Sequence, residues 1–157
     1  KALMIKINVI LNNIIWKKYL KNPHKFIDQK VKLLNIRNKS DKKIKFICSL
    51  LLSGNKEIRK LNKKFRNKDR STDILSFPFY ERKVLYKKIK KEKEIYLGDI
   101  IINLNKFKNK KDKSKFKEEL NKLWIHGLIH LFGHKHKKDK DFMIMQKIEK
   151  KYLEYTQ

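Results

Sequence analysis

Near the start of the chain, apolar residues recur with the two-residue period of a β-strand. Leu3, Ile5, Ile7 and Val9 occupy every second position there. Residues 44–52 are instead an almost continuous apolar run, which is typical of a strand buried on both faces. Two later runs are rich in β-forming residues. The predicted strands are residues 3–10, 44–52, 72–79, which stops at Pro78, and 95–104, which begins near Gly98.

Elsewhere apolar residues are spaced by three or four positions, which is the period of an amphipathic helix. Ile58, Leu61 and Phe65 follow this spacing, and the helix that they predict delivers Arg66 at its end. A break at Asn22-Pro23 interrupts another helical stretch, because proline disfavours the helical conformation in the residue before it. The predicted helices are residues 13–36 with that break, 55–65, a helix marked by Phe116, Leu120, Leu123, Trp124, Leu128 and Leu131, and 141–155 with Phe142, Met145, Ile148 and Tyr152 along one stripe.

Two lysine-rich segments lack a clear period. Residues 80–94 predict a connection, which is either a mobile loop over the functional site or a solvated charge run. Residues 105–114 predict a loop or a frayed helix. The whole pattern, without internal repeats, predicts an α+β fold in which residues 1–157 form a single domain with a roughly four-stranded mixed sheet packed by helices. A chain of 157 residues with 40% hydrophobic content is long enough to bury a core.

Composition favours a reducing compartment. The only cysteine, Cys48, lies in a predicted strand, where it is expected to be a small buried core residue. The longest apolar runs fall far short of the ~20 residues that cross a bilayer, and the start of the chain lacks a signal-peptide pattern. We therefore expect a cytoplasmic protein without a membrane partner.

Three histidines have the spacing of a metal site. His126 and His130 are four residues apart on a predicted helix, so their side chains share one face with Cβ atoms about 6 Å apart. Gly133 is expected to end this helix, because glycine readily takes the left-handed conformation, and the next loop then brings His136 toward the same ion. Three nitrogen ligands suit one zinc ion and, in a catalytic site, leave its fourth position to water.

Neighbouring residues bear on this interpretation. Two histidines four residues apart are common on helices, and His134 is an alternative third ligand. Gly127 stands where zinc peptidases of the H-E-x-x-H type carry their general base, which argues against peptidase chemistry. Its expected use is close packing of backbone or substrate against that turn. His24, Glu118 and Glu119 are expected to be exposed.

The chain is strongly basic, with 43 Lys+Arg against 16 Asp+Glu and a formal net charge of +27, which favours polyanionic partners. Five of the basic residues are arginine and the rest lysine, a bias that A+T-rich codons also produce, so only part of the charge is assigned to function. Arg66 stands out against this background, because a forked, always charged guanidinium suits a phosphate. The alternative is an ion pair of Arg66 with Asp69 or Glu57 at the helix end.

Three segments carry a family resemblance. The run H-G-L-I-H-L-F-G-H-K-H from His126 resembles the H-G-x-L-H-L-x-G-Y-D-H signature of the YbeY family. The members of that family are bacterial zinc-dependent endoribonucleases. The segment L-N-K-K-F-R-N-K-D-R-S-T-D-I-L-S-F-P from Leu61 and the strand Y-L-G-D-I-I-I from Tyr96 are similar to two further blocks of that family. Met145 and Glu149 match its M-x-x-x-E pattern.

The resemblance implies that His126, His130 and His136 bind one Zn2+ ion on a helix like that of the zincin metalloproteases, and that Arg66 is important for activity. It also implies a single-strand-specific endoribonuclease that acts in 3'-end maturation of small-subunit (16S) ribosomal RNA and in ribosome quality control. The expected partners are single-stranded RNA, ribosomal RNA and the ribosomal small subunit, with no DNA.

The sequence departs from the family where His134-Lys135 replaces Tyr-Asp. If that aspartate orients a ligand or activates water, its loss lowers the rate or the metal affinity, unless Asp73 or Asp99 substitutes for it. A non-catalytic, zinc-stabilised RNA-binding ribosome-assembly factor is therefore an alternative. Another is a zinc hydrolase for a peptide or small ester, which Gly127 disfavours.

Overall fold

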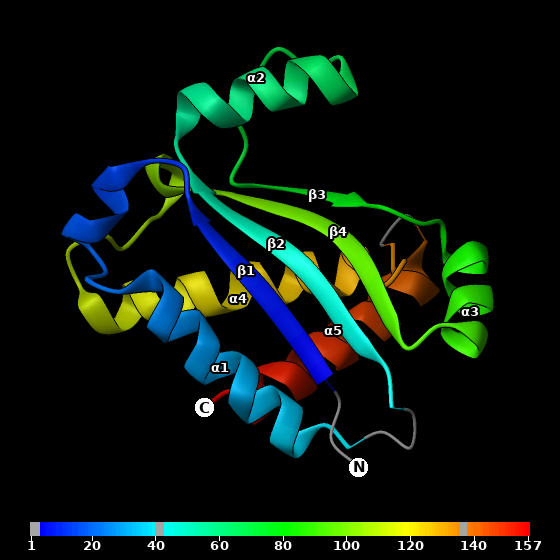
Figure 1. Cartoon of the computed structure of the whole chain (residues 1–157). Coiled ribbons are helices and arrows are strands. Elements are labelled where there is room, and N and C mark those ends of the chain that lie inside the picture. The colour runs from blue at the N-terminus through cyan, green and yellow to red at the C-terminus, as the bar shows by residue number, and fades with distance from the viewer. Residues whose placement is uncertain (1–3, 40–42, 136–137) are drawn as a thin grey trace.

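The computed structural model describes residues 4–39, 43–135 and 138–157, which form a four-stranded sheet covered by helices (Figure 1). The strand order is β1-β2-β4-β3, in which β1, β2 and β4 are parallel and β3 lies at the edge, antiparallel to β4. The strands are β1 (Met4–Leu11), β2 (Lys45–Ser53), β3 (Ile74–Pro78) and β4 (Glu94–Asn103). The helices are η1 (Ile14–Lys18, a 3-10 helix), α1 (Pro23–Arg37), α2 (Asn55–Arg66), α3 (Arg82–Lys91), η2 (Leu104–Lys106, a 3-10 helix), α4 (Lys113–Leu131) and α5 (Asp139–Tyr155).

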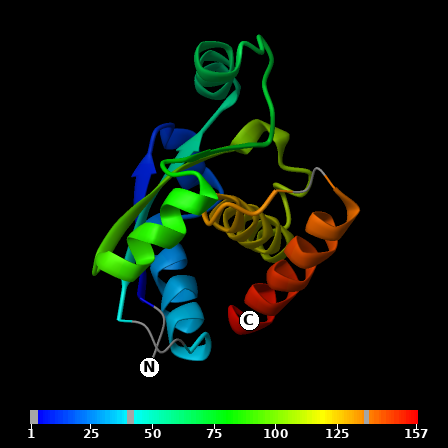
Figure 2. The same cartoon turned by 90° about the vertical axis from the view of Figure 1, so that its right-hand side faces the viewer.

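The main core lies between the sheet and helices α1 and α4. Alternate residues of β2, such as Phe46 and Cys48, contribute to it and are buried. Helix α5 lies on the far side of α4 from the sheet and also contacts α1 (Figure 2). Helix α2 packs on β3 and β4 over a separate small cluster of Ile58, Leu75 and Ile101. The sheet is therefore covered on both faces near its β3 edge.

A glycine holds the end of β3 close to β4. Gly98 has φ +135°, and a Cβ added there would lie 2.1 Å from the carbonyl oxygen of Phe77. Only glycine allows two backbones to approach so closely in this conformation. The backbone N–H of Phe79 then donates to the carbonyl of Leu97 at 2.9 Å. This contact fixes the chain that leads from β3 into α3.

The structure confirms the predicted strands and most of the predicted helices, with small shifts at their ends. Leu3, in the first predicted strand, lies outside the described residues. The predicted break before Pro23 is confirmed, because α1 begins there after η1. The side chain of Asn22 caps α1 by accepting a hydrogen bond from the N–H of Lys25 at 3.0 Å. Cys48 is fully buried, as predicted.

Two sequence predictions are wrong. The lysine-rich residues 80–94 contain α3 rather than only a loop, because Leu85 and Ile89, one helical turn apart, pack on the core. Phe142 is 48% exposed in the first turn of α5, whereas Met145 of the same predicted stripe is buried. Among the described residues, no helix is both long enough and apolar enough to span a membrane.

Candidate functional site

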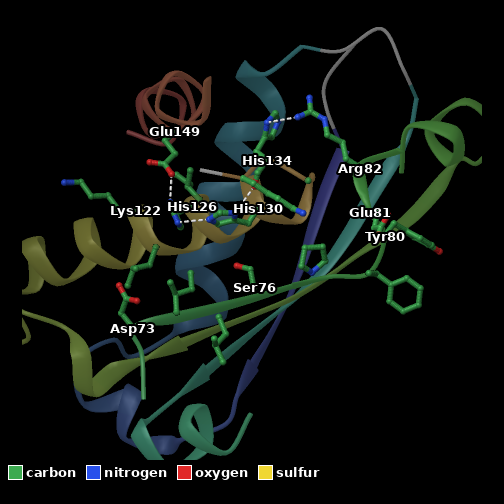
Figure 3. Close-up of a pocket in the computed structure, with 18 of the residues that line it drawn as sticks. Asp73, Ser76, Tyr80, Glu81, Arg82, Lys122, His126, His130, His134 and Glu149 are labelled. Atoms are coloured by element: carbon green, nitrogen blue, oxygen red, sulfur yellow. Dashed lines mark hydrogen bonds and ion pairs between the residues drawn. The ribbon is translucent and has the colours of Figure 1, made fainter. Parts of the chain in front are cut away.

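A cleft of about 1300 Å³ lies between β3 and the C-terminal half of α4 (Figure 3). Its other walls are the start of α3, the turn after α4 and part of α5. Helix α4 packs directly on β3 and β4, so the packing of helix on sheet holds these two walls of the cleft together. The predicted site residues that the structure describes, Arg66, His126 and His130, all line this cleft.

The two helical histidines converge on one point. His126 and His130 lie one turn apart on α4, and their ring centroids are 4.6 Å apart. The two Nε2 atoms are 3.0 Å apart and face each other (Figure 3). Ligands that lie ~2.0–2.1 Å from one tetrahedral ion are themselves about 3.3 Å apart. The separation of the two nitrogens therefore fits a shared metal ion.

The other ring nitrogen of each histidine is held by an acceptor of the protein. Nδ1 of His126 contacts the Glu149 carboxylate on α5, and Nδ1 of His130 lies 2.8 Å from the backbone carbonyl of His134. A carboxylate and a carbonyl only accept hydrogen bonds, so Nδ1–H is the donor in both cases. In the neutral rings the proton then lies on Nδ1, and the Nε2 lone pairs point to the shared position. Metal-binding histidines are commonly oriented by such contacts.

The predicted third ligand, His136, lies outside the described residues. Without it, the described residues contain no group of three side chains able to hold a metal. The ring of the alternative ligand, His134, faces α3 instead, with Nδ1 3.5 Å from Nη1 of Arg82 (Figure 3). Burial, and then the charge of Arg82, lower the pKa of His134. The metal-ligand roles of the three predicted histidines stay predictions.

Two glycines shape the histidine segment. Gly133 has φ +91° directly after α4, as expected of a helix-ending glycine. A Cβ there would lie 2.8 Å from Cβ of Arg82, so α3 packs tightly against this turn. At Gly127, an added Cβ would lie 2.7 Å from Cγ2 of Ile100 on β4. The close packing predicted for Gly127 is therefore present, but its partner is the side chain of Ile100 rather than backbone or substrate.

Arg66 ends α2 and reaches the cleft from beside β3. Its Nη2 donates to the carbonyl of Ser76 at 2.7 Å, and its guanidinium carbon lies 5.3 Å from the centre of the Phe77 ring. The alternative ion pairs of Arg66 with Asp69 or Glu57 are wrong. Asp69 is instead paired with Arg59 at 2.8 Å, and Glu57 accepts a hydrogen bond at 3.2 Å from the side-chain amide of Asn13, the N-cap of η1. The role of Arg66 in activity stays a prediction.

Basic side chains outnumber acidic ones around the cleft. The basic residues that line it are Arg66, Arg82, Lys83, Lys122 and Lys135, and the acidic ones are Asp73, Glu81 and Glu149. Lys135 thus places a positive charge where the resembling family has an aspartate. Of the two carboxylates considered as replacements, Asp73 lines the cleft, whereas Asp99 accepts a hydrogen bond from the hydroxyl of Tyr96 on β4.

Sequence reasoning missed two contacts of this site. Glu149 orients His126 across a separation of 23 residues, and Arg82 contacts both Gly133 and His134 from α3. The M-x-x-x-E pattern pointed to Glu149 but not to its partner. For Arg82, an arginine in a lysine-rich segment was the available signal.

Known proteins resemble the chain over most of its length. The family described as Endoribonuclease YbeY matches residues 11–157. A protein of Pelagibacter ubique named Endoribonuclease YbeY is 42% identical over 153 residues, which are 93% of this chain and 92% of that protein. A Thermodesulfovibrio yellowstonii protein of the same name is 33% identical over 80% of this chain and 74% of its own length.

A solved structure is also similar over nearly the whole chain. The solution structure of a Thermotoga maritima protein aligns with a TM-score of 0.56 and 28% identity, covering 96% of this chain and 89% of the other. Sequence and structural similarity therefore extend over the sheet, the histidine helix and α5 alike. The chain belongs to the YbeY family of endoribonucleases.

Proposed function

We propose that this endoribonuclease cleaves single-stranded RNA with the help of one zinc ion held by His126, His130 and His136. The observation that carries the proposal is the histidine pair, whose Nε2 atoms lie 3.0 Å apart while both Nδ1 atoms are held by acceptors. This donor set fits zinc, which prefers neutral imidazole nitrogens. Bound there, zinc would supply a Lewis acid or a water of lowered pKa.

Arg66 is proposed to bind the phosphate at which cleavage occurs. A guanidinium has five N–H donors, and the bond to Ser76 uses one of them. That bond, with the Phe77 ring beside it, fixes the plane of the guanidinium. The positive charge of the guanidinium then stabilises the extra negative charge that develops on the phosphate oxygens in the transition state. The neighbouring lysines of the cleft bind the RNA backbone, which gives affinity without base specificity.

The cleft favours RNA over a peptide. An extended peptide would bind by adding a strand to the edge strand β3. On that strand Arg66 already binds the carbonyl of Ser76, and Pro78 has no N–H to donate. Gly127, moreover, stands where zinc peptidases have their base. By family membership, the RNA is proposed to be precursor small-subunit ribosomal RNA near its 3' end, with roles in ribosome quality control and a cytoplasmic location.

Cleavage of a short single-stranded RNA, with metal content measured on each sample, tests the proposal. We expect His130→Ala to lose both metal and cleavage. Arg66→Ala should keep its metal and cleave about 100- to 1000-fold more slowly, as when one transition-state donor is removed. Arg59→Ala is the matched control, since Arg59 lies on the same helix but binds Asp69.

Two outcomes would contradict the proposal. Undiminished cleavage by metal-free His130→Ala would exclude the zinc mechanism. Tight RNA binding by the metal-loaded wild-type protein without any cleavage would favour the non-catalytic assembly factor instead.

A further inference from the structure

We infer that Phe79 is a stacking platform for one nucleobase of the RNA strand that occupies the cleft. The inference rests on the proposed single-stranded RNA substrate and adds to it a residue that recognises an unpaired base. Phe79 follows directly after β3 and lines the same cleft as His126 and His130. Its side chain is 64% exposed.

Phe79 differs from the other exposed apolar side chains in its position. Among the described residues, several large apolar side chains are well exposed, and of these only Phe79 also lines the cleft. The exposed part of an aromatic ring in a cleft is an apolar contact surface that the fold itself does not cover. A base is a suitable occupant, because every base has a π-face that stacks on an aromatic ring.

The ring is held in place before any ligand binds. The backbone N–H of Phe79 donates to the carbonyl of Leu97 at 2.9 Å, and a Cβ at Gly98 would lie only 3.0 Å from the same nitrogen. The ring meets the rings of Tyr80 and Tyr96 edge to face, with centroids 4.9 and 5.9 Å apart. A platform fixed in this way loses little conformational entropy when a base stacks on it.

Charges next to the ring suit the phosphates that flank a stacked base. Arg82 and Lys83 follow three and four residues later and line the cleft, and Nζ of Lys88 lies 4.9 Å from the centre of the Tyr80 ring. Two carboxylates offset these charges, since Glu81 lines this wall and Glu92 pairs with Lys88 at 2.9 Å, so the balance there is positive but modest. Aromatic rings interleaved with cations are typical of single-strand binding surfaces. Bases of a duplex are already stacked, so this platform selects unpaired RNA.

Binding of a fluorescent single-stranded RNA, measured by anisotropy with a chelator present to prevent metal-dependent cleavage, tests the inference. We expect Phe79→Ala to weaken binding about tenfold, the loss typical of one stacked base. Phe79→Trp should bind at least as tightly as wild type. Phe142→Ala is the matched control, because Phe142 is exposed but does not line the cleft. On an abasic strand of equal length, wild type and Phe79→Ala should bind equally well.

The inference is overturned if Phe79→Ala leaves binding of the intact strand unchanged. It is also overturned if the substitution weakens the intact and abasic strands alike, since the ring would then act through the fold or the backbone. Wild-type protein that fails to bind single-stranded RNA at all would instead overturn the proposed function. A melting temperature for each variant separates lost contacts from lost structure.

Discussion

At the scale of single residues, Gly127 shows how tightly the histidine helix is packed. It lies beside His126, and an added Cβ would lie 2.7 Å from Cγ2 of Ile100. That methyl group is attached to the Cβ of a fully buried side chain, so it cannot move aside cheaply. Helix propensity would favour alanine by up to ~1 kcal/mol, but the steric conflict is the larger effect.

We therefore predict that Gly127→Ala lowers the free energy of unfolding by about 1–3 kcal/mol, as overpacked cores do. Urea denaturation measures the change. In an Ile100→Ala background the conflicting methyl is gone, so the same substitution should be neutral or stabilising. An equal loss in both backgrounds would show that the contact with Ile100 is not the cause.

Cys48 gives a second prediction at this scale. Burial raises the pKa of its thiol to about 12, with a further contribution from the charge of Asp99. A thiol is nucleophilic only as the thiolate. We expect native protein to resist alkylation by iodoacetamide at pH 8, and urea-unfolded protein to react fully, as mass spectrometry would record. Rapid alkylation of the native protein at pH 8 would contradict the burial.

The raised pKa of Cys48 also favours folding below about pH 9, and this contribution to the free energy of unfolding is lost as the pH rises toward about 12.

At the scale of elements, the site depends on how α5 meets α4. The Glu149 carboxylate on α5 holds Nδ1 of His126 on α4, so the orientation of one predicted ligand is set by a neighbouring helix. The turn after α4 does the same for His130 through the carbonyl of His134. The contact between α4 and α5 and the turn after α4 thus determine where the two Nε2 atoms point.

We predict that Glu149→Gln weakens zinc binding about 10- to 100-fold, the usual effect of removing a group that orients a ligand. Competition with a chromophoric chelator measures the affinity without relying on activity. Glu154→Gln is the matched control, since Glu154 is an exposed carboxylate on the same helix. If both variants bind zinc as wild type does, Glu149 has no positioning role.

The sequence predicted elements well where one period dominated. Alternation in β1 and the break at Pro23 each had a single local cause, and both are present. In α3, lysines obscured the spacing of Leu85 and Ile89, so the helix was missed. The contact between His126 and Glu149 depends on how two helices pack, and no local pattern encodes that.

At the scale of the whole molecule, the position of charge matters more than its amount. The net charge of +27 is spread over the chain, but five lysines or arginines line the cleft. These five could not be separated from the others by sequence alone, because the sequence does not specify the sheet order or which loops meet. It did identify Arg66, His126 and His130, which the fold brings to one cleft.

If all five basic residues of the cleft contact phosphates, the logarithm of RNA affinity should fall with the logarithm of salt concentration with a slope of about −3.5. Lys122→Ala should reduce this slope by about 0.7. Lys6→Ala is the control, because Lys6 is exposed on β1, at the opposite edge of the sheet from β3. Equal changes for the two variants would show that RNA binds through diffuse charge rather than in the cleft.

Whether His126 and His130 share one metal ion can be seen by anomalous diffraction from zinc-loaded crystals at the zinc absorption edge. We expect one peak about 2.0–2.1 Å from both Nε2 atoms, with His136 as the third protein ligand and a fourth position open to solvent. A peak held by the ring of His134, a shell closed by four protein ligands, or no peak between the two histidines would contradict it.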